Sequence, residues 1–227
     1  MPDPRCLMPV LAACALLAGC AQSPHPAACS GAPARQVADL ATIQAHVRAQ
    51  RRQVLTFEGF SGAGYQDQPA MLALAGRILD AEDPARVLVN IGGTAEGLGA
   101  VYALARQRGF ATLGIVSTLA QDEQVPLSPC VDQVFFVRDS RWGGLDPATG
   151  GLSPTSQAIV AVSDRMVGIG GGDIARDEML AARRLGVPVQ VHPADMDHAQ
   201  ARAKALRRGE PAPVDFRGTA HPALAPG

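Results

Sequence analysis

The sequence has few aromatic residues and almost no net charge. Phenylalanine, tryptophan and tyrosine make up 4% of its 227 residues, and the formal net charge at pH 7 is -1. Proteins that bind single-stranded nucleic acid stack bases on aromatic side chains, and proteins that bind duplexes or acidic membranes present a strong positive field. We therefore expect no nucleic-acid partner and no electrostatic attraction to a membrane.

The sequence also lacks the patterns of metal sites and of nucleophilic serines. His192 and His198 stand alone instead of in ligand pairs, so we expect no metal and no cofactor. Ser61 follows Gly59-Phe60, which does not give the G-x-S-x-G turn of a hydrolase. A serine hydrolase and a metalloenzyme are therefore not indicated.

No apolar run is long enough to cross a bilayer as a permanent helix. The longest, residues 7–18, follows a short start with Arg5, and its length suits the core of a signal peptide. Its continuation, LLAGC ending at Cys20, resembles the lipobox of bacterial lipoproteins. The resemblance implies that residues 1–19 are a signal peptide, that Cys20 carries lipid, and that the protein is anchored to the outer membrane, facing the periplasm. An ordinary secretory signal peptide with an incidental Cys20 is the alternative.

The five cysteines are informative once this signal peptide is removed. Cys6 and Cys14 leave with it and Cys20 is lipidated, so Cys29 and Cys130 remain in an oxidising compartment. They either form a disulfide or remain as two free thiols, because the sequence does not fix the geometry that a disulfide requires.

The remaining chain reads as one α/β domain. Residues 20–34, rich in proline, alanine and serine, predict a linker, and the domain proper spans 35–200, beginning with an amphipathic helix from Val37. Strands that are apolar throughout and alternate with helices are typical of a parallel sheet covered on both faces. We predict a doubly wound, mostly parallel Rossmann-like sheet with helices on both faces. Residues 201–227 are predicted as a helical extension and, from Pro211, a disordered tail. The predicted strands are 54–60, 86–91, 110–116, 133–137, 165–170 and 187–191.

Two glycine turns follow predicted strands, GGTAEGLG at residues 92–99 and GGGD at 170–173. Glycine lets a ligand approach the backbone, and the N–H groups of a first helical turn point at that ligand. We expect one ligand site shared by both turns. At the second turn, Asp173 is expected to cap the helix and to occupy the N–H groups that a phosphate would use. We therefore expect a phosphate at the first turn, where the capping residue is the uncharged Thr94. The predicted ligand-binding residues are Gly92, Gly93, Thr94, Gly97, Gly99, Gly170, Gly171, Gly172 and Asp173, with Arg138 and Arg141 in a lid-like loop beside Trp142.

These turns resemble the motifs of the SLOG superfamily, the Rossmann-like group that contains the Lonely Guy phosphoribohydrolases, once labelled lysine decarboxylase-like. The matching positions are Gly92, Gly93 and Gly99 of GGxxGLMG and Gly171, Gly172 and Glu178 of PGGxGTxxE. The sequence departs from the first motif at Gly97, to which the middle glycine is displaced. It departs from the second at Gly170, Ile174 and Ala175, which stand in place of the proline, the second glycine and the threonine. The resemblance implies that Glu178 is the catalytic carboxylate in hydrolysis of the N-glycosidic bond of a nucleoside monophosphate. The family's catalytic arginine has no matching motif here.

Three functions remain open at this point. Retained glycines without the complete enzyme motif favour a lipoprotein that binds a nucleotide-derived or sugar-containing small molecule. Glu178 favours a phosphoribohydrolase, and a structural envelope lipoprotein with a vestigial pocket is the third alternative. Glu58, Asp67 and Glu96 near strand ends suit sugar hydroxyls or a divalent cation better than a polyphosphate. The family's enzymes are often dimers, which implies a homodimer as one arrangement.

Overall fold

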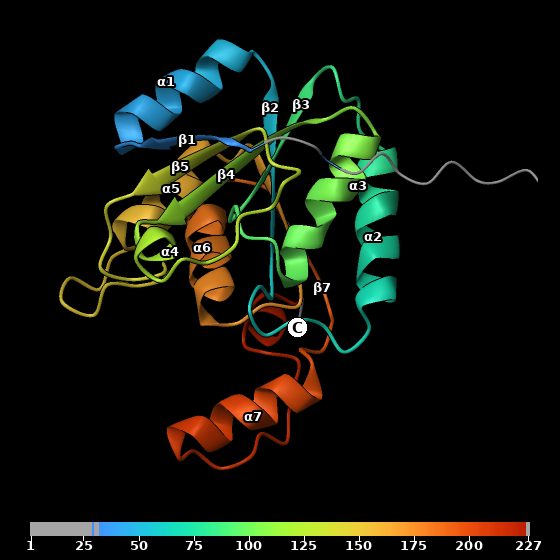
Figure 1. Ribbon diagram of the computed structural model, residues 1–227, viewed down its shortest axis with the longest axis vertical. Helices are drawn as coiled ribbons and strands as arrows, with labels where there is room; N and C mark the ends of the chain where they lie inside the picture. Colours follow the sequence, from blue (N-terminus) through green and yellow to red (C-terminus); the bar gives the residue numbers. More distant parts are fainter. Residues whose placement is uncertain (1–28, 30–31, 226–227) are drawn as a thin grey trace, which may run out of the picture.

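The computed structural model describes residue 29 and residues 32–225 (Figure 1). The predicted signal peptide, Cys20 and most of the predicted linker lie outside the described residues. Among the helices of the described part, none combines the length and the apolar character that crossing a membrane requires.

Seven parallel strands form one sheet in the order β1-β5-β4-β3-β2-β6-β7. The chain runs from β2 outward through β3, β4 and β5, and then returns to β6 on the other side of β2. The winding therefore reverses between β2 and β6, where α/β proteins bind ligands at the carboxyl edge of the sheet. The predicted doubly wound, Rossmann-like fold is confirmed, with all strand pairs parallel. The strands are β1 (Ala34–Val37), β2 (Gln53–Gly59), β3 (Val87–Ile91), β4 (Ala111–Ser117), β5 (Gln133–Val137), β6 (Arg165–Ile169) and β7 (Val189–His192).

Helices cover both faces of the sheet, because the strands are apolar on both sides. Along β2, Leu55 and Phe57 belong to the core beneath α2 and α3, whereas Val54 belongs to the core beneath α5 and α6. We call these the α2–α3 face and the α5–α6 face. The first is covered by α2 (Gln68–Asp80), η1 (Gly97–Ala100), α3 (Val101–Gln107) and α4 (Leu119–Asp122), and the second by α1 (Leu40–Gln50), α5 (Pro154–Val162), α6 (Asp173–Arg184) and α8 (Ala220–Leu224).

The amino-terminal end of the domain differs from the prediction. We expected a helix from Val37, but residues 34–37 form strand β1, which pairs with β5 at the edge of the sheet. The helix begins only at Leu40, because the Asp39 side chain accepts the Thr42 N–H and caps it. Val37 had the right spacing for the helix by coincidence.

The prediction of a disordered tail from Pro211 is wrong for residues 211–225. Helix α7 (His198–Arg208) lies apart from the sheet at the lower end of the molecule, and the chain then returns to form α8 (Figure 1). Ala220 and Leu224 of α8 are fully buried, and Arg183 of α6 donates to the Leu224 carbonyl at 2.7 Å. The carboxyl-terminal segment therefore belongs to the packed domain.

A disulfide joins Cys29 to Cys130, which are 101 residues apart in sequence. Cys130 is buried in the core of the α2–α3 face, and its backbone carbonyl accepts the Thr112 hydroxyl at 3.1 Å. The disulfide thus fastens the segment before β1 to the body of the domain.

Candidate functional site

Glu178 lies in the second turn of α6 and is only 1% exposed. The Ser156 hydroxyl of α5 donates to its Oε1 atom at 2.5 Å. Its Oε2 atom is also buried, and no ordinary donor of the described chain reaches it. Glu178 is therefore not an exposed acid that merely complements the helix dipole, and its second oxygen needs another source of hydrogen.

That source is Glu58, near the carboxyl end of β2; we call Glu58 and Glu178 the acid pair. The two side chains lie close enough for each to shift the pKa of the other, and a hydrogen bond between them requires one of the two carboxyl groups to carry a proton. Burial, the charge of Glu178 and this hydrogen bond all raise the pKa of Glu58 well above its usual range. Burial raises the pKa of Glu178 as well, but the bonds from Glu58 and Ser156 lower it in part. Of the two carboxyl groups, Glu58 therefore keeps a proton more readily.

Replacing Glu58 with Gln is expected to flatten the pH dependence of stability. Because its pKa is raised in the folded state, the folded protein binds more protons than the unfolded one, so stability falls as pH rises from about 4.5 toward the folded pKa. Glutamine still donates to Glu178 but does not titrate. Urea unfolding at a series of pH values should show a steeper decline for the wild type than for Glu58→Gln. The exposed Glu123→Gln should follow the wild type, and equal slopes for all three proteins would contradict the shared proton.

Open space adjoins the acid pair at Gly92. Thr56 of β2 lies opposite Asn90 of β3, so Glu58 and Gly92, two residues further on, are neighbours on the same face. A side chain at Gly92 would meet nothing within 4 Å. Asn90 donates to the Thr56 hydroxyl, and its buried Oδ1 atom has no partner in the described chain. A ligand above Gly92 would therefore meet a partly exposed Glu58 and polar groups without partners.

Four of the eight backbone donors of the first glycine turn, residues 92–99, are bonded within the protein. The N–H groups of Ala95 and Leu98 donate to the carbonyl oxygens of Pro126 and Phe60 at 3.0 and 2.8 Å. Those of Gly93 and Gly99 are bonded as well. The phosphate that we expected here would therefore have only the remaining donors of the turn, and its binding stays a prediction.

The predicted cap of this turn is also incorrect. Thr94 forms an isolated bridge with Leu127, and Glu96 occupies the position before η1. Gly97 and Gly99 serve packing, because a Cβ atom at Gly97 would overlap the carbonyl oxygen of Phe60 and one at Gly99 that of Thr94. These two glycines let the turn lie close against neighbouring backbone.

The second glycine turn, Gly170 to Gly172, is covered by the carboxyl-terminal segment. Ala220 N–H donates to the Gly171 carbonyl at 3.0 Å, and the Thr219 hydroxyl donates to Asp173 at 2.8 Å. Asp173 is not the helix cap that we predicted: Gly172 takes the cap position, and Asp173 forms an ion pair with Arg176 at 2.7 Å.

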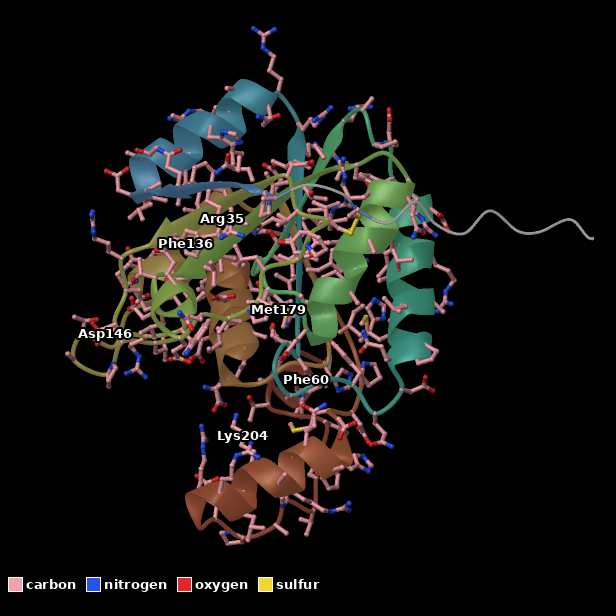
Figure 2. All side chains as sticks on the ribbon, in the orientation of Figure 1. Arg35, Phe60, Phe136, Asp146, Met179 and Lys204 are labelled. Carbon is pink, nitrogen blue, oxygen red and sulfur yellow. A yellow bond between two sulfur atoms is a disulfide. The ribbon has the colours of Figure 1, made fainter. Side chains whose placement is uncertain are left out.

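The two turns do not share one ligand site in the way we predicted. They follow β3 and β6, which flank β2, and the residues after β2 lie between them. The Phe60 carbonyl accepts the Leu98 N–H of the first turn, and its ring lies where a side chain at Gly170 would be. Figure 2 shows Phe60 at the lower end of the sheet, between the body and α7. The residues after β2 therefore separate the two turns.

The two tyrosines of the chain each fasten one glycine turn, which sequence reasoning missed. The Tyr102 hydroxyl accepts the Gly93 N–H and lies within bonding distance of the Ile91 and Leu113 carbonyls, at 2.8 and 2.7 Å. The Tyr65 hydroxyl accepts from Phe60 N–H and donates to the Ile169 carbonyl. Burial raises the pKa of both hydroxyls, so they remain protonated. Their side chains are buried, and only the position of each ring in the fold shows this role.

The loop between β5 and α5 lies over Ser156. Gly144 N–H donates to the Ser156 hydroxyl at 2.7 Å, and Leu145 N–H donates to Asp177 at 3.2 Å. The predicted ligand residues Arg138 and Arg141 are exposed on this loop, as is Trp142, and Asp146 marks its outer tip (Figure 2). The structure therefore places the loop beside the acid pair but brings neither arginine into a bond with it.

Other site types find no support in the described part of the chain. No group of three or more histidine, cysteine, aspartate or glutamate side chains there is arranged to hold a metal ion. Two cavities, of about 360 and 400 Å³, lie away from the acid pair.

Comparison with known proteins yields a likeness of fold only. No family model matches the sequence, and no curated protein matches it. Among solved structures, the chain is similar to the X-ray structure of TM1055, with 22% identity over 60% of this chain and 72% of the other, at a TM-score of 0.42. It is also similar to the molybdenum cofactor carrier protein of Chlamydomonas reinhardtii, in one structure with 17% identity over 70% and 86% of the two chains and a TM-score of 0.43. A second structure of that protein gives 18% identity over 69% and 98%, at 0.36. Likeness at this level assigns no ligand or activity to this chain.

Proposed function

We propose that this domain binds a small, hydroxyl-rich molecule of the sugar-containing class at the acid pair beside Gly92. The observation that carries the proposal is the buried carboxyl group of Glu178 beside the partly exposed Glu58, next to open space at the carboxyl edge of the sheet. Such a pair offers both a hydrogen-bond donor and acceptors, which is what a sugar hydroxyl requires. The motif match at Glu178 supports the same place.

The charges nearby favour an uncharged ligand. Asp173 and Asp177 lie on the same helix as Glu178, and Arg176 is paired to both aspartates. Four of the eight backbone donors of the first glycine turn are bonded within the protein, and a phosphate there would meet the carboxyl groups of the acid pair. A neutral sugar or nucleoside therefore fits better than a nucleoside monophosphate.

A ligand panel with the Glu178→Gln variant tests this function. The mature chain is incubated with ribose, adenosine and adenosine monophosphate while thermal shift and released base are recorded together. We expect adenosine to stabilise the wild type, and at 100 times its dissociation constant a ligand adds roughly 2.7 kcal/mol. Glu178→Gln should weaken binding about tenfold or more, because hydrogen bonds to charged groups contribute about 1.5–3 kcal/mol.

The matched control is Glu123→Gln, which removes an exposed carboxylate near α4 and should bind as the wild type does. A wild type that ignores the whole panel, or a Glu178→Gln variant that binds with unchanged affinity, would defeat the proposal. Stronger binding of the monophosphate than of adenosine would contradict the preference for a neutral ligand.

Hydrolysis of an N-glycosidic bond is the second candidate, and the raised pKa of Glu58 favours it. Glu58 would protonate the base as the N-glycosidic bond breaks, water would add to the sugar carbon and return a proton to Glu58, and Glu178 would stabilise the positive charge that develops on the sugar. However, two carboxyl groups in glycosidases stand roughly 5 Å or more apart to admit the reacting bond. The hydrogen-bonded acid pair would have to separate first, which is why binding is preferred. Base release that Glu178→Gln abolishes would establish the enzyme instead.

The proposal includes an anchor at Cys20 that holds the domain at the outer membrane, facing the periplasm. The lipobox-like sequence supports it, and the Cys29–Cys130 disulfide suits an oxidising compartment. The intact mass of protein extracted from membranes tests it, because lipid on Cys20 adds to the mass of the processed chain.

A further inference from the structure

A cavity of about 400 Å³ lies on the α2–α3 face, opposite the side of the sheet that carries Glu178. One wall is a single face of α2, and the other is formed by Ile169 at the end of β6 and by residues 193–195 after β7. This volume is within the range of sites for small organic ligands. None of the acid-pair residues lines it, so the cavity is independent of the proposed function.

The walls of this cavity are apolar in the middle and charged at the two ends. Met71 and Leu74 of α2 face Ile169 across it. Asp67 lies at the amino end of α2 and Arg77 lies ten residues later, which is about 15 Å along the helix. Asp195 lies at the same end as Asp67, because its backbone carbonyl accepts the N–H of Gln66, the residue before Asp67. The cavity therefore has an acidic end, an apolar centre and a basic end.

The basic end has polar groups without partners in the described residues. Arg77 forms no ion pair or side-chain hydrogen bond within residues 32–225, and it is exposed. His192, next to the wall residue Pro193, has a buried Nε2 atom without a partner in that range. Burial, followed by the positive charges of His221 and Arg77, lowers the pKa of His192. The lowered pKa favours the neutral form of His192, so Arg77 supplies the positive charge at this end.

We infer that this cavity binds a short zwitterionic ligand with an apolar body, of the dipeptide type, with its carboxylate at Arg77 and its ammonium group at Asp67 and Asp195. An extended dipeptide is about 7 Å long. Side chains on an α-helix point back toward its amino end. The distance between the Arg77 guanidinium group and Asp67 is therefore shorter than the separation of the two residues along the helix. Met71, Leu74 and Ile169 cover the apolar side chains of the ligand.

Calorimetric titration of the mature chain with leucyl-leucine tests the inference. The wild type should bind it, and Arg77→Gln should lose at least tenfold in affinity. Arg86→Gln is the matched control, since Arg86 is an exposed arginine just before β3 and outside the cavity. The dipeptide with its amino group acetylated and its carboxyl group amidated should bind at least tenfold more weakly, because it offers neither charge.

A second variant separates the site from the fold. Ala70 lines the cavity but is exposed on α2, so Ala70→Trp should fill the cavity while leaving the helix intact. We expect it to block leucyl-leucine and leave adenosine binding at the acid pair unchanged, whereas Glu178→Gln should do the reverse. The inference would be overturned if the wild type did not bind leucyl-leucine, if the blocked dipeptide bound equally well, or if Arg77→Gln bound with unchanged affinity. Each of these outcomes is independent of the result at the acid pair.

Discussion

Removal of the Cys29–Cys130 disulfide is expected to lower the free energy of unfolding by about 4.7 kcal/mol. The two cysteines are 101 residues apart, so the bond closes a long loop in the unfolded chain and removes much of its conformational entropy. Urea unfolding of the wild type against the Cys29→Ala, Cys130→Ala double variant measures the difference. Part of the loss will come from Cys130 itself, because its side chain is buried and alanine is smaller.

The reductant control isolates the contribution of the bond. Adding dithiothreitol should destabilise the wild type by nearly the same amount and leave the double variant unchanged. The largest structural effect should fall on β1, an exposed edge strand that pairs only with β5 and follows Cys29 closely. Faster amide exchange in residues 34–37 than in β3 after reduction would show this. A difference of less than 1 kcal/mol between oxidised and reduced protein would refute the prediction.

The fold class could be predicted from the sequence because the central strands are apolar throughout. Strand β3, for example, has all five residues buried, so it has no polar face that could point to solvent. Strands of this kind indicate a parallel sheet that is covered on both faces. The edges could not be predicted in the same way. Strand β1 is exposed along its whole length and carries no apolar pattern. Helix α8 has five residues, too few to show helical periodicity, and is stabilised by contacts with α6.

The candidate site was predicted only in part, because its decisive contacts are long-range. Glu178 was identified by its motif, whereas Glu58 was one of several carboxylates near strand ends. Their pairing depends on β6 lying beside β2, which places the start of α6 next to the end of β2. The glycine turns were located correctly, but the groups that occupy them, such as Pro126 and Ala220, come from distant parts of the chain.

Replacing Tyr102 with Phe should destabilise the protein by about 2–3 kcal/mol and loosen the first glycine turn. The side chain is fully buried, and its hydroxyl accepts the Gly93 N–H at 3.1 Å. Phenylalanine fills the same space but leaves that donor buried without a partner, which costs about 1–3 kcal/mol, and the carbonyls of Ile91 and Leu113 lose a polar neighbour as well. Urea unfolding gives the stability loss, and amide exchange at Gly93 reports the turn.

Tyr65→Phe is the matched control, because it removes an equally buried hydroxyl from the second glycine turn. It should cost a similar amount of stability without speeding exchange at Gly93. Gly93 takes a positive φ of 77°, and its position fixes Gly92 beside Glu58. A looser turn would therefore weaken adenosine binding in Tyr102→Phe at a temperature where the protein is still folded. If affinity and Gly93 exchange both stay at their wild-type values, the hydroxyl contributes only to stability, and the shape of the ligand site does not depend on it.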